Sequence, residues 1–168
     1  MAHDAIQGWP QLAAGANEGR SVAIKGMGSL QAKLKNISKS YASNKQVRAG
    51  FLEGATYPDG TPVALVAAVH EFGAPAKGIP VRPFMRTAIA QNKGKWSEQL
   101  ARGIEATGNV EGALGFVGVE MASDIRNSIR DEEFTALKPA TVNRKGFATP
   151  LIDTAHMVNS VDHDVTER

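Results

Sequence analysis

Residues 69–86 read VHEFGAPAKGIPVRPFMR and contain the clearest local signals in the chain. Gly73 follows a compact apolar run over 63–69 and is a natural helix stop, because glycine accepts a left-handed backbone. Three prolines and Gly78, together with Gly73 just before them, predict an irregular loop over 74–83. Pro83 suits the first turn of a following helix, where its missing N–H is not needed. The segment therefore predicts a short helix, a stiff loop and a second helix that carries Phe84 and runs towards Leu100, with Gly94 as its weak point.

Two further elements are predicted upstream. Apolar residues recur at helical spacing over 28–41 and predict an amphipathic helix; they are Leu30, Leu34, Ile37 and Tyr41. Residues 46–57 alternate between two faces, which is typical of a strand, and Tyr57-Pro58-Asp59-Gly60 is a strong turn signal.

Downstream, an apolar stripe predicts a helix over 110–130. Gly112, Gly115 and Gly118 lower its helix propensity and predict a groove that another backbone can approach closely. A basic, turn-rich loop is expected over 137–150, a short helix over 151–160 and a terminal strand over 161–168. Helices mixed with few strands, without a βαβ rhythm, indicate an α+β fold.

The composition narrows the class of protein. The chain has 168 residues and no cysteine, which excludes disulfides, Cys-ligated zinc, iron–sulfur clusters and a thiol nucleophile. No apolar run is long enough to span a membrane, and the N-terminus lacks the features of a signal peptide. We expect an N-terminal arm over residues 1–20, one domain over 21–168 and synthesis in a cytosol.

The formal net charge of +2 hides an uneven distribution. Residues 19–52 carry seven basic and no acidic side chains, whereas 98–133 carry eight acidic side chains against three arginines. Such asymmetry can guide docking between copies or attract a polyanion, and ordinary solvated faces are an equally good interpretation.

No catalytic or cofactor motif is found. The four histidines have no metal-ligand spacing, and the glycines match no phosphate-binding loop. Asp153, His156 and Ser160 have the residue types of a hydrolase triad, but three members on one short helix cannot easily converge on a substrate, and there is no GxSxG elbow. We expect a protein that is not an enzyme and that binds no cofactor or metal.

The segments Val69–Gly73 and Ile79–Arg86 resemble the hEFG…IPxRPFhR signature of tailed-bacteriophage tail-completion, or neck, proteins, where h is apolar. Residues 149–160, TPLIDTAHMVNS, are similar to a second motif of that family, PLhDTGxLxxSh. The resemblance covers about residues 28–165, and Ala155 stands where the family usually has glycine. The matching positions are Glu71, Phe72, Gly73, Pro80, Arg82, Pro83, Phe84, Arg86, Leu151, Asp153, Thr154 and Ser160.

These motif residues have mainly fold-defining roles. Glu71 is expected to pair with Arg82 or Arg86, Phe84 to anchor its helix in the core, and Asp153 and Thr154 to satisfy backbone donors at a helix start. Direct contact with a partner is an equally good interpretation of both motifs.

The resemblance implies a virion protein, assembled in a bacterial cytoplasm, with a small antiparallel sheet flanked by helices. It implies a homo-oligomeric ring, taken as a hexamer, at the head–tail junction. Its partners would be a tail tube or tail terminator protein on one side and a head-completion or connector protein on the other, with DNA passing through the lumen and no membrane contact. Terminator and head-side adaptor roles both stay open, as do the ring stoichiometry and the tail type.

A ring needs two different patches on each subunit. The basic first third, with Lys33, Lys35 and Lys39, and the acidic stretch over 98–133 are candidate complementary patches. The alternative is a sequence-independent nucleic-acid-binding protein whose basic segment 20–48 contacts phosphates.

Overall fold

The computed structural model describes residues 27–41, 44–131 and 133–168, so the expected arm over 1–20 lies outside the described residues. The elements follow one another as α1 (Met27–Tyr41), β1 (Lys45–Phe51), α2 (Val63–Phe72), a 3₁₀ turn η1 (Pro75–Lys77), α3 (Phe84–Thr107), α4 (Val110–Asp131), α5 (Pro139–Lys145), α6 (His156–Asn159) and β2 (Val161–Glu167). Helices combined with a small antiparallel sheet confirm the predicted α+β class.

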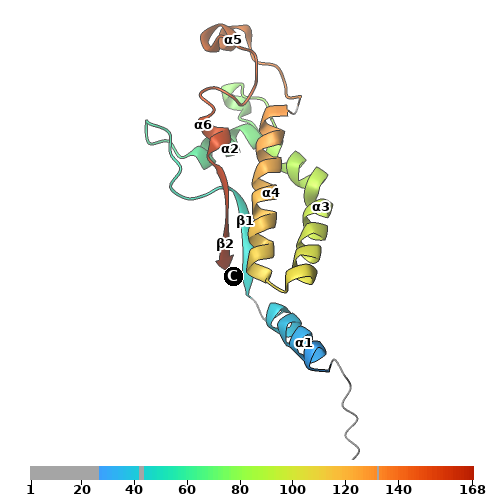
Figure 1. The fold of residues 1–168 in the computed structure, drawn as a ribbon. Helices are drawn as coiled ribbons and strands as arrows, with labels where there is room; N and C mark the ends of the chain where they lie inside the picture. The colour runs from blue at the N-terminus through green and yellow to red at the C-terminus, as the bar shows by residue number, and fades with distance from the viewer. Residues whose placement is uncertain (1–26, 42–43, 132) are drawn as a thin grey trace, which may run out of the picture.

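The sheet pairs the first strand with the last. β1 and β2 run antiparallel, with Lys45 opposite Glu167 at one end and Phe51 opposite Val161 at the other. Arg48 forms an ion pair with Asp164 at 2.7 Å across the pair. α4 packs against both strands, and α3 lies along α4 (Figure 1). Two strands alone are marginal in water, so α4 supplies most of the cover that makes this sheet stable.

One glycine determines how closely α4 meets the sheet. Gly118 is buried, and a Cβ atom there would lie 2.9 Å from a methyl carbon of Val47 on β1 and 2.9 Å from Cγ of His163 on β2. Gly115 faces open space, and Gly112 faces Asn109, whose side chain accepts its N–H at 3.0 Å. The predicted glycine groove is therefore one close approach at Gly118, made by side chains of the two strands.

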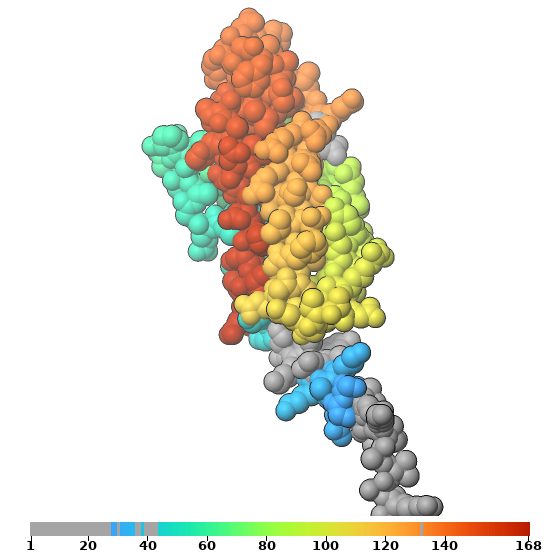
Figure 2. All heavy atoms as spheres, viewed as in Figure 1, coloured from blue at the N-terminus to red at the C-terminus, as the bar shows by residue number. Residues whose placement is uncertain are grey.

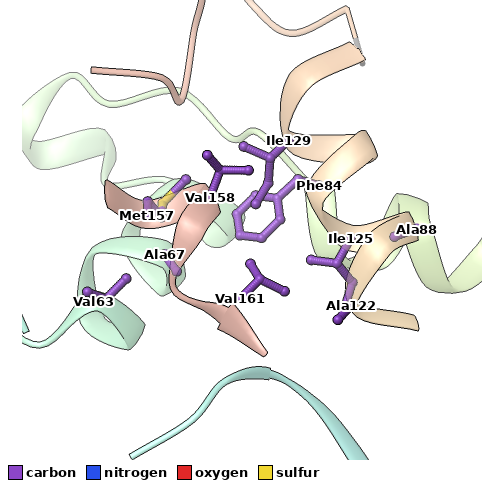
Figure 3. Close-up of a cluster of buried hydrophobic side chains, with 10 residues drawn as sticks. All are labelled: Val63, Ala67, Phe84, Ala88, Ala122, Ile125, Ile129, Met157, Val158 and Val161. Atoms are coloured by element: carbon purple, nitrogen blue, oxygen red, sulfur yellow. The ribbon is translucent and has the colours of Figure 1, made fainter. Parts of the chain in front are cut away.

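The core lies where α2, α3, α4, α6 and β2 meet (Figure 3). Phe84 lies within this core and is 1% exposed, which confirms its predicted role as the anchor of α3. Its ring meets the ring of Phe51 edge to face, with centroids 6.0 Å apart. The buried residues drawn in Figure 3 are Val63, Ala67, Phe84, Ala88, Ala122, Ile125, Ile129, Met157, Val158 and Val161.

Several predicted boundaries are wrong. β1 ends at Phe51 and not near residue 57, because the chain turns at Gly54, where φ is 92°. The predicted end of α2 is confirmed, because the helix runs to Phe72 and Gly73 follows it with φ of 75°. α3 runs through Gly94 to Thr107, well past Leu100.

The C-terminal third differs more. The expected loop over 137–150 contains α5, which begins at Pro139 and ends at Gly146, a left-handed C-cap. The expected helix over 151–160 is reduced to His156–Asn159, because Leu151 and Ala155 both take φ of 60°, which a right-handed helix does not allow.

α1 lies beyond the end of the body formed by α3, α4 and the two strands (Figures 1 and 2). Leu34 of its predicted apolar stripe is 55% exposed. The side chains of the other three stripe residues lie outside those described.

Candidate functional site

Glu71 joins α2 to the start of α3. Its carboxylate is buried and accepts hydrogen bonds from the backbone N–H groups of Met85 at 2.9 Å and Arg86 at 3.2 Å. The same carboxylate pairs with Nε of Arg86 at 2.8 Å, while Nη2 of Arg86 donates to the Glu71 carbonyl at 2.9 Å. Pro83, the residue before α3, provides no side-chain cap. Glu71 therefore caps α3 from the preceding helix, and the expected partner is Arg86.

Arg82 is held differently. It is 4% exposed, its backbone N–H donates to the carbonyl of His70 at 2.8 Å, and its Nη2 donates to the carbonyl of Thr135 at 3.2 Å. Its Nε is buried without a hydrogen-bond partner, and none of the ion pairs among the described residues includes Arg82. Burial lowers the pKa of its guanidinium. The Glu71–Arg82 alternative is therefore wrong.

Phe72, a further residue of the first motif, lies outside the core. Its side chain is 67% exposed and lies beneath the guanidinium of Arg86, 5.4 Å from the ring centroid. Gly73 beside it has no room for a side chain, since a Cβ would lie 3.1 Å from the backbone nitrogen of Val81. Pro80 is half-buried in the loop between the helices. The motif thus positions one aromatic side chain in solvent, next to a rigid turn.

α2 is apolar on both its buried and its exposed side, unlike a usual amphipathic surface helix. Its two polar residues, His70 and Glu71, are half-buried and buried. Its exposed positions are apolar, and include Leu65 at 56% and Phe72 at 67% exposed, with Ala64 and Ala68 on the same exposed side. An exposed apolar helix face next to buried polar residues is a candidate contact surface.

The second motif forms a tight turn and a short helix. Asp153 and Thr154 are exposed, and α6 begins after Ala155 with no side-chain cap, so their predicted capping role is wrong. Ala155 takes φ of 60° and ψ of 7°, the left-handed conformation that the glycine of the family motif adopts without strain. Leu151 is half-buried against the core.

The triad residue types do not form a catalytic relay. The Ser160 hydroxyl donates to the backbone carbonyl of His156 at 2.8 Å. The imidazole of His156 contacts the carbonyl of Thr56 at 2.9 Å and the ring of Tyr57, with centroids 4.8 Å apart.

The two motif segments meet around one pocket of about 600 Å³. The first segment contributes His70 and Arg82, and the second contributes residues 151–154, 156 and 157. The remaining walls come from the turn after β1, from Val66 of α2 and from the region of α5, through Tyr57, Pro58, Leu137, Thr141, Arg144 and Lys145. Sequence spacing gave no signal for this pocket, because its walls come from residues 57–82 and 137–157, which no local pattern connects.

The pocket is cationic with apolar walls. Burial, together with the positive charges of Arg82 and Lys145, lowers the pKa of His70. Burial also lowers the pKa of Lys145, whose ammonium donates to the carbonyls of Thr149, at 2.8 Å, and Ile152. Burial and the nearby Asp153 raise the pKa of Tyr57, which keeps its hydroxyl protonated. Among the described residues of the lining, Asp153 is the only acidic one.

Part of the charge asymmetry seen in the sequence is offset by ion pairs within the chain. Lys45 pairs with Glu111 at 2.5 Å, and Lys95 pairs with Asp124 at 2.9 Å. Lys33 and Lys35 are exposed on α1, and the side chain of Lys39 lies outside the described residues.

Within the described parts of the chain, no cluster of three or more metal-ligating side chains occurs. None of the described helices is both long and apolar enough to span a bilayer. Comparison with family models, with curated proteins and with solved structures finds no match to this chain.

Proposed function

We propose that this chain is the subunit of a homo-oligomeric ring that joins the tail to the head of a tailed bacteriophage and leaves a channel for DNA. The bacteriophage assignment rests on the two motif segments, which resemble tail-completion proteins and which lie together in the fold around one pocket. The assembly rests on the exposed apolar face of α2.

The α2 face is the observation that carries the proposal. Leu65 and Phe72 are each more than half exposed, although one side of the same helix contributes Val63 and Ala67 to the core. At about 25 cal/mol for each Å² of apolar surface removed from water, covering two such side chains favours association. A face of this kind is typical of a protein–protein contact.

A second apolar patch lies on α4. Phe116 is 59% exposed and Val119 is 52% exposed, one turn apart on the helix. A closed ring requires that one patch of each subunit contact a different patch of the next. The α2 face of one copy against the α4 patch of the next satisfies this requirement with residues that the chain itself supplies.

The test is the oligomeric state of the full chain, by native mass spectrometry and negative-stain electron microscopy. We expect closed rings of one stoichiometry, with six subunits as the first expectation. Phe72→Gln should shift the population towards monomer. Phe147→Gln is the matched control, because Phe147 is also an exposed aromatic beneath a cation, Lys145, at 4.6 Å, but lies outside both patches.

A chain that stays monomeric up to about 100 μM, or a Phe72→Gln variant that assembles like the wild type, would contradict this proposal. The combined Lys33→Glu, Lys35→Glu and Lys39→Glu variant tests the charged route separately. If α1 docks on an acidic face, this variant should lose rings at low salt; if the apolar patches suffice, the rings persist.

The nucleic-acid-binding alternative is tested with duplex DNA of random sequence across a salt series. Binding by the isolated subunit with a steep loss of affinity as salt rises would favour it. Two of the seven basic residues in the segment are already paired, Lys45 with Glu111 and Arg48 with Asp164, which reduces the number of cations free for phosphates.

Deleting the coding sequence from a phage that carries it gives the functional test. Full heads beside finished, separate tails would support a joining role, and overlong tails would indicate a terminator.

A further inference from the structure

We propose that the pocket between the two motif segments binds a carboxylate group attached to an apolar body. The proposal does not depend on the ring or on the bacteriophage assignment. It rests on a buried guanidinium for which the described residues supply no counter-ion, on the place of Arg82 in the lining of a cavity, and on the walls around it.

Arg82 is the centre of the site. Arg82 lines the pocket although only 4% of the residue's surface is exposed. A guanidinium has five N–H donors, yet the described contacts give the side chain one acceptor, the carbonyl of Thr135. Its Nε is buried with no partner. A buried charge without a partner is costly, and an anion that enters the pocket removes that cost.

The surroundings of Arg82 add to the positive field. Arg144 and Lys145 line the same pocket, where Asp153 is the single acid among the described lining residues. His70 lines the same cavity, and its Nδ1 is a second buried polar atom without a hydrogen-bond partner among the described residues. Glu71, the nearest acid in the first motif, is already held by Arg86 and by the start of α3. The described residues therefore supply an excess of positive charge here, and none of them gives Arg82 a carboxylate partner.

The walls indicate the rest of the ligand. Val66, Leu137, Leu151, Ile152 and Met157 are apolar, and a volume of about 600 Å³ lies within the range of small-molecule sites. Bare inorganic anions gain little from such walls. A carboxylate on an aliphatic or aromatic body satisfies both the planar guanidinium and the apolar lining.

The same carboxylate can belong to a free organic acid or to an acidic side chain next to an apolar residue in a peptide. The burial of Arg82 in a concave site favours either of these over the backbone of duplex DNA, whose phosphates are bound by exposed basic surfaces.

The experiment measures binding to the full-length chain by isothermal titration calorimetry at low salt. The probes are 4-phenylbutyrate, its neutral counterpart 4-phenylbutanamide, inorganic phosphate and a capped Phe-Glu dipeptide. We expect saturable binding of 4-phenylbutyrate or of the dipeptide with a Kd of about 1 mM or tighter, and at least tenfold weaker binding of the neutral amide. Absence of binding by both carboxylates, equal binding of the amide, or binding of phosphate alone would overturn the proposal.

Three variants test the site. Arg144→Gln removes an exposed cation of the pocket and should weaken binding about three- to tenfold. Arg130→Gln removes an exposed arginine of α4 outside the pocket, and should leave the Kd unchanged. Arg82→Met should abolish binding without lowering the Tm of the free protein, because it replaces an unpaired buried charge with an apolar side chain.

If Arg82 has a purely structural role, the Arg82→Met variant should instead show a large loss of Tm. If Arg82→Met does not fold, the Arg144→Gln and Arg130→Gln pair decides alone. Equal affinity in those two variants would refute the site.

Discussion

Replacing Glu71 with glutamine should destabilise the protein by about 3 kcal/mol, although the side chain keeps its shape. The carboxylate accepts three hydrogen bonds, from Met85 N–H, Arg86 N–H and Arg86 Nε. A glutamine has one carbonyl oxygen, and its NH₂ group would face a donor. The position of Oε1, which serves Arg86 twice, is the best place for that oxygen, and the N–H of Met85 then loses its partner.

The magnitude follows from the separate contributions. A buried backbone donor without a partner costs about 1–3 kcal/mol. Two hydrogen bonds that change from charged to neutral lose about 1 kcal/mol each. The bond to the Arg86 side chain counts for less, because that side chain is 57% exposed and water replaces part of the interaction. The sum is about 3 kcal/mol, with a range of about 2–4 kcal/mol.

Urea unfolding followed by tryptophan fluorescence measures this change. Trp96 is a suitable probe because it is 7% exposed and its indole N–H donates to Asp124 at 2.8 Å. A Trp9→Phe background leaves Trp96 as the single tryptophan. With a urea m-value of about 2 kcal/mol/M, the midpoint should fall by about 1.5 M.

Glu98→Gln is the control for a general effect of charge removal. Glu98 pairs with Arg102 on an exposed face of α3, where such pairs contribute about 0.5 kcal/mol or less. If the two variants shift the urea midpoint equally, or if Glu71→Gln shifts it by less than about 0.3 M, the assignment of Glu71 as the cap of α3 is wrong.

Three further predictions concern single positions. Gly118→Ala should destabilise the protein by about 1–3 kcal/mol, because the new methyl group would meet Val47 and His163. Gly115→Ala, on the same helix but facing open space, should stabilise the protein by up to about 1 kcal/mol. Thermal unfolding of both variants checks the two expectations. Ala155→Gly should leave the free energy of unfolding within about 0.5 kcal/mol of wild type, because relief of the left-handed backbone offsets the lost methyl contact and the added freedom of the unfolded chain. Ala64→Gly, on the exposed side of α2, should lower the free energy of unfolding by about 1 kcal/mol. A similar loss in both variants would show that Ala155 is not strained. Burial lowers the pKa of His70 in the folded state, so the free energy of unfolding should fall as the pH drops below about 6.5. His70→Gln should weaken this pH dependence in urea midpoints measured between about pH 5.5 and 7.5. An unchanged slope in the variant would assign the pH effect to other groups.

Local signals predicted the helix boundaries around the first motif. Gly73 ends α2, and Pro83 directly precedes α3, as their backbone preferences require. β2 lies close to the predicted terminal strand, and β1 covers the first half of the predicted strand over 46–57. The helix ends and the strands were predictable because each is determined by a few neighbouring residues, whereas the antiparallel sheet was implied by the family resemblance.

The outward face of α2 could not be predicted from periodicity. Leu65, Phe72, Val63 and Ala67 are all apolar, so the pattern has no side that sequence alone marks as exposed. The buried orientation of Glu71 results from the backbone donors at the start of α3, and only the folded chain brings these together.

α5 and the pocket were missed for different reasons. α5 has the signals of a helix, with Pro139 in its first turn and Gly146 after its end, but it is too short for a periodic stripe to show. The pocket combines Arg82 with side chains from residue 57 and from residues 137–157, and no local pattern connects these positions.

The pairing of β1 with β2 has a consequence for the order in which the chain folds. The side chain of Asn44 donates to the carbonyl of Arg168 at 2.9 Å, across a separation of 124 residues, and the strands between these points pair along their whole length. During synthesis β1 therefore has no strand to pair with until the residues between the two strands have been made. A contact of such long range also forms slowly. Until then, its backbone is an unprotected strand edge. A ribosome that stalls before Val161 would display such an edge, and chaperones that bind extended segments are expected to recognise that nascent chain better than the finished protein.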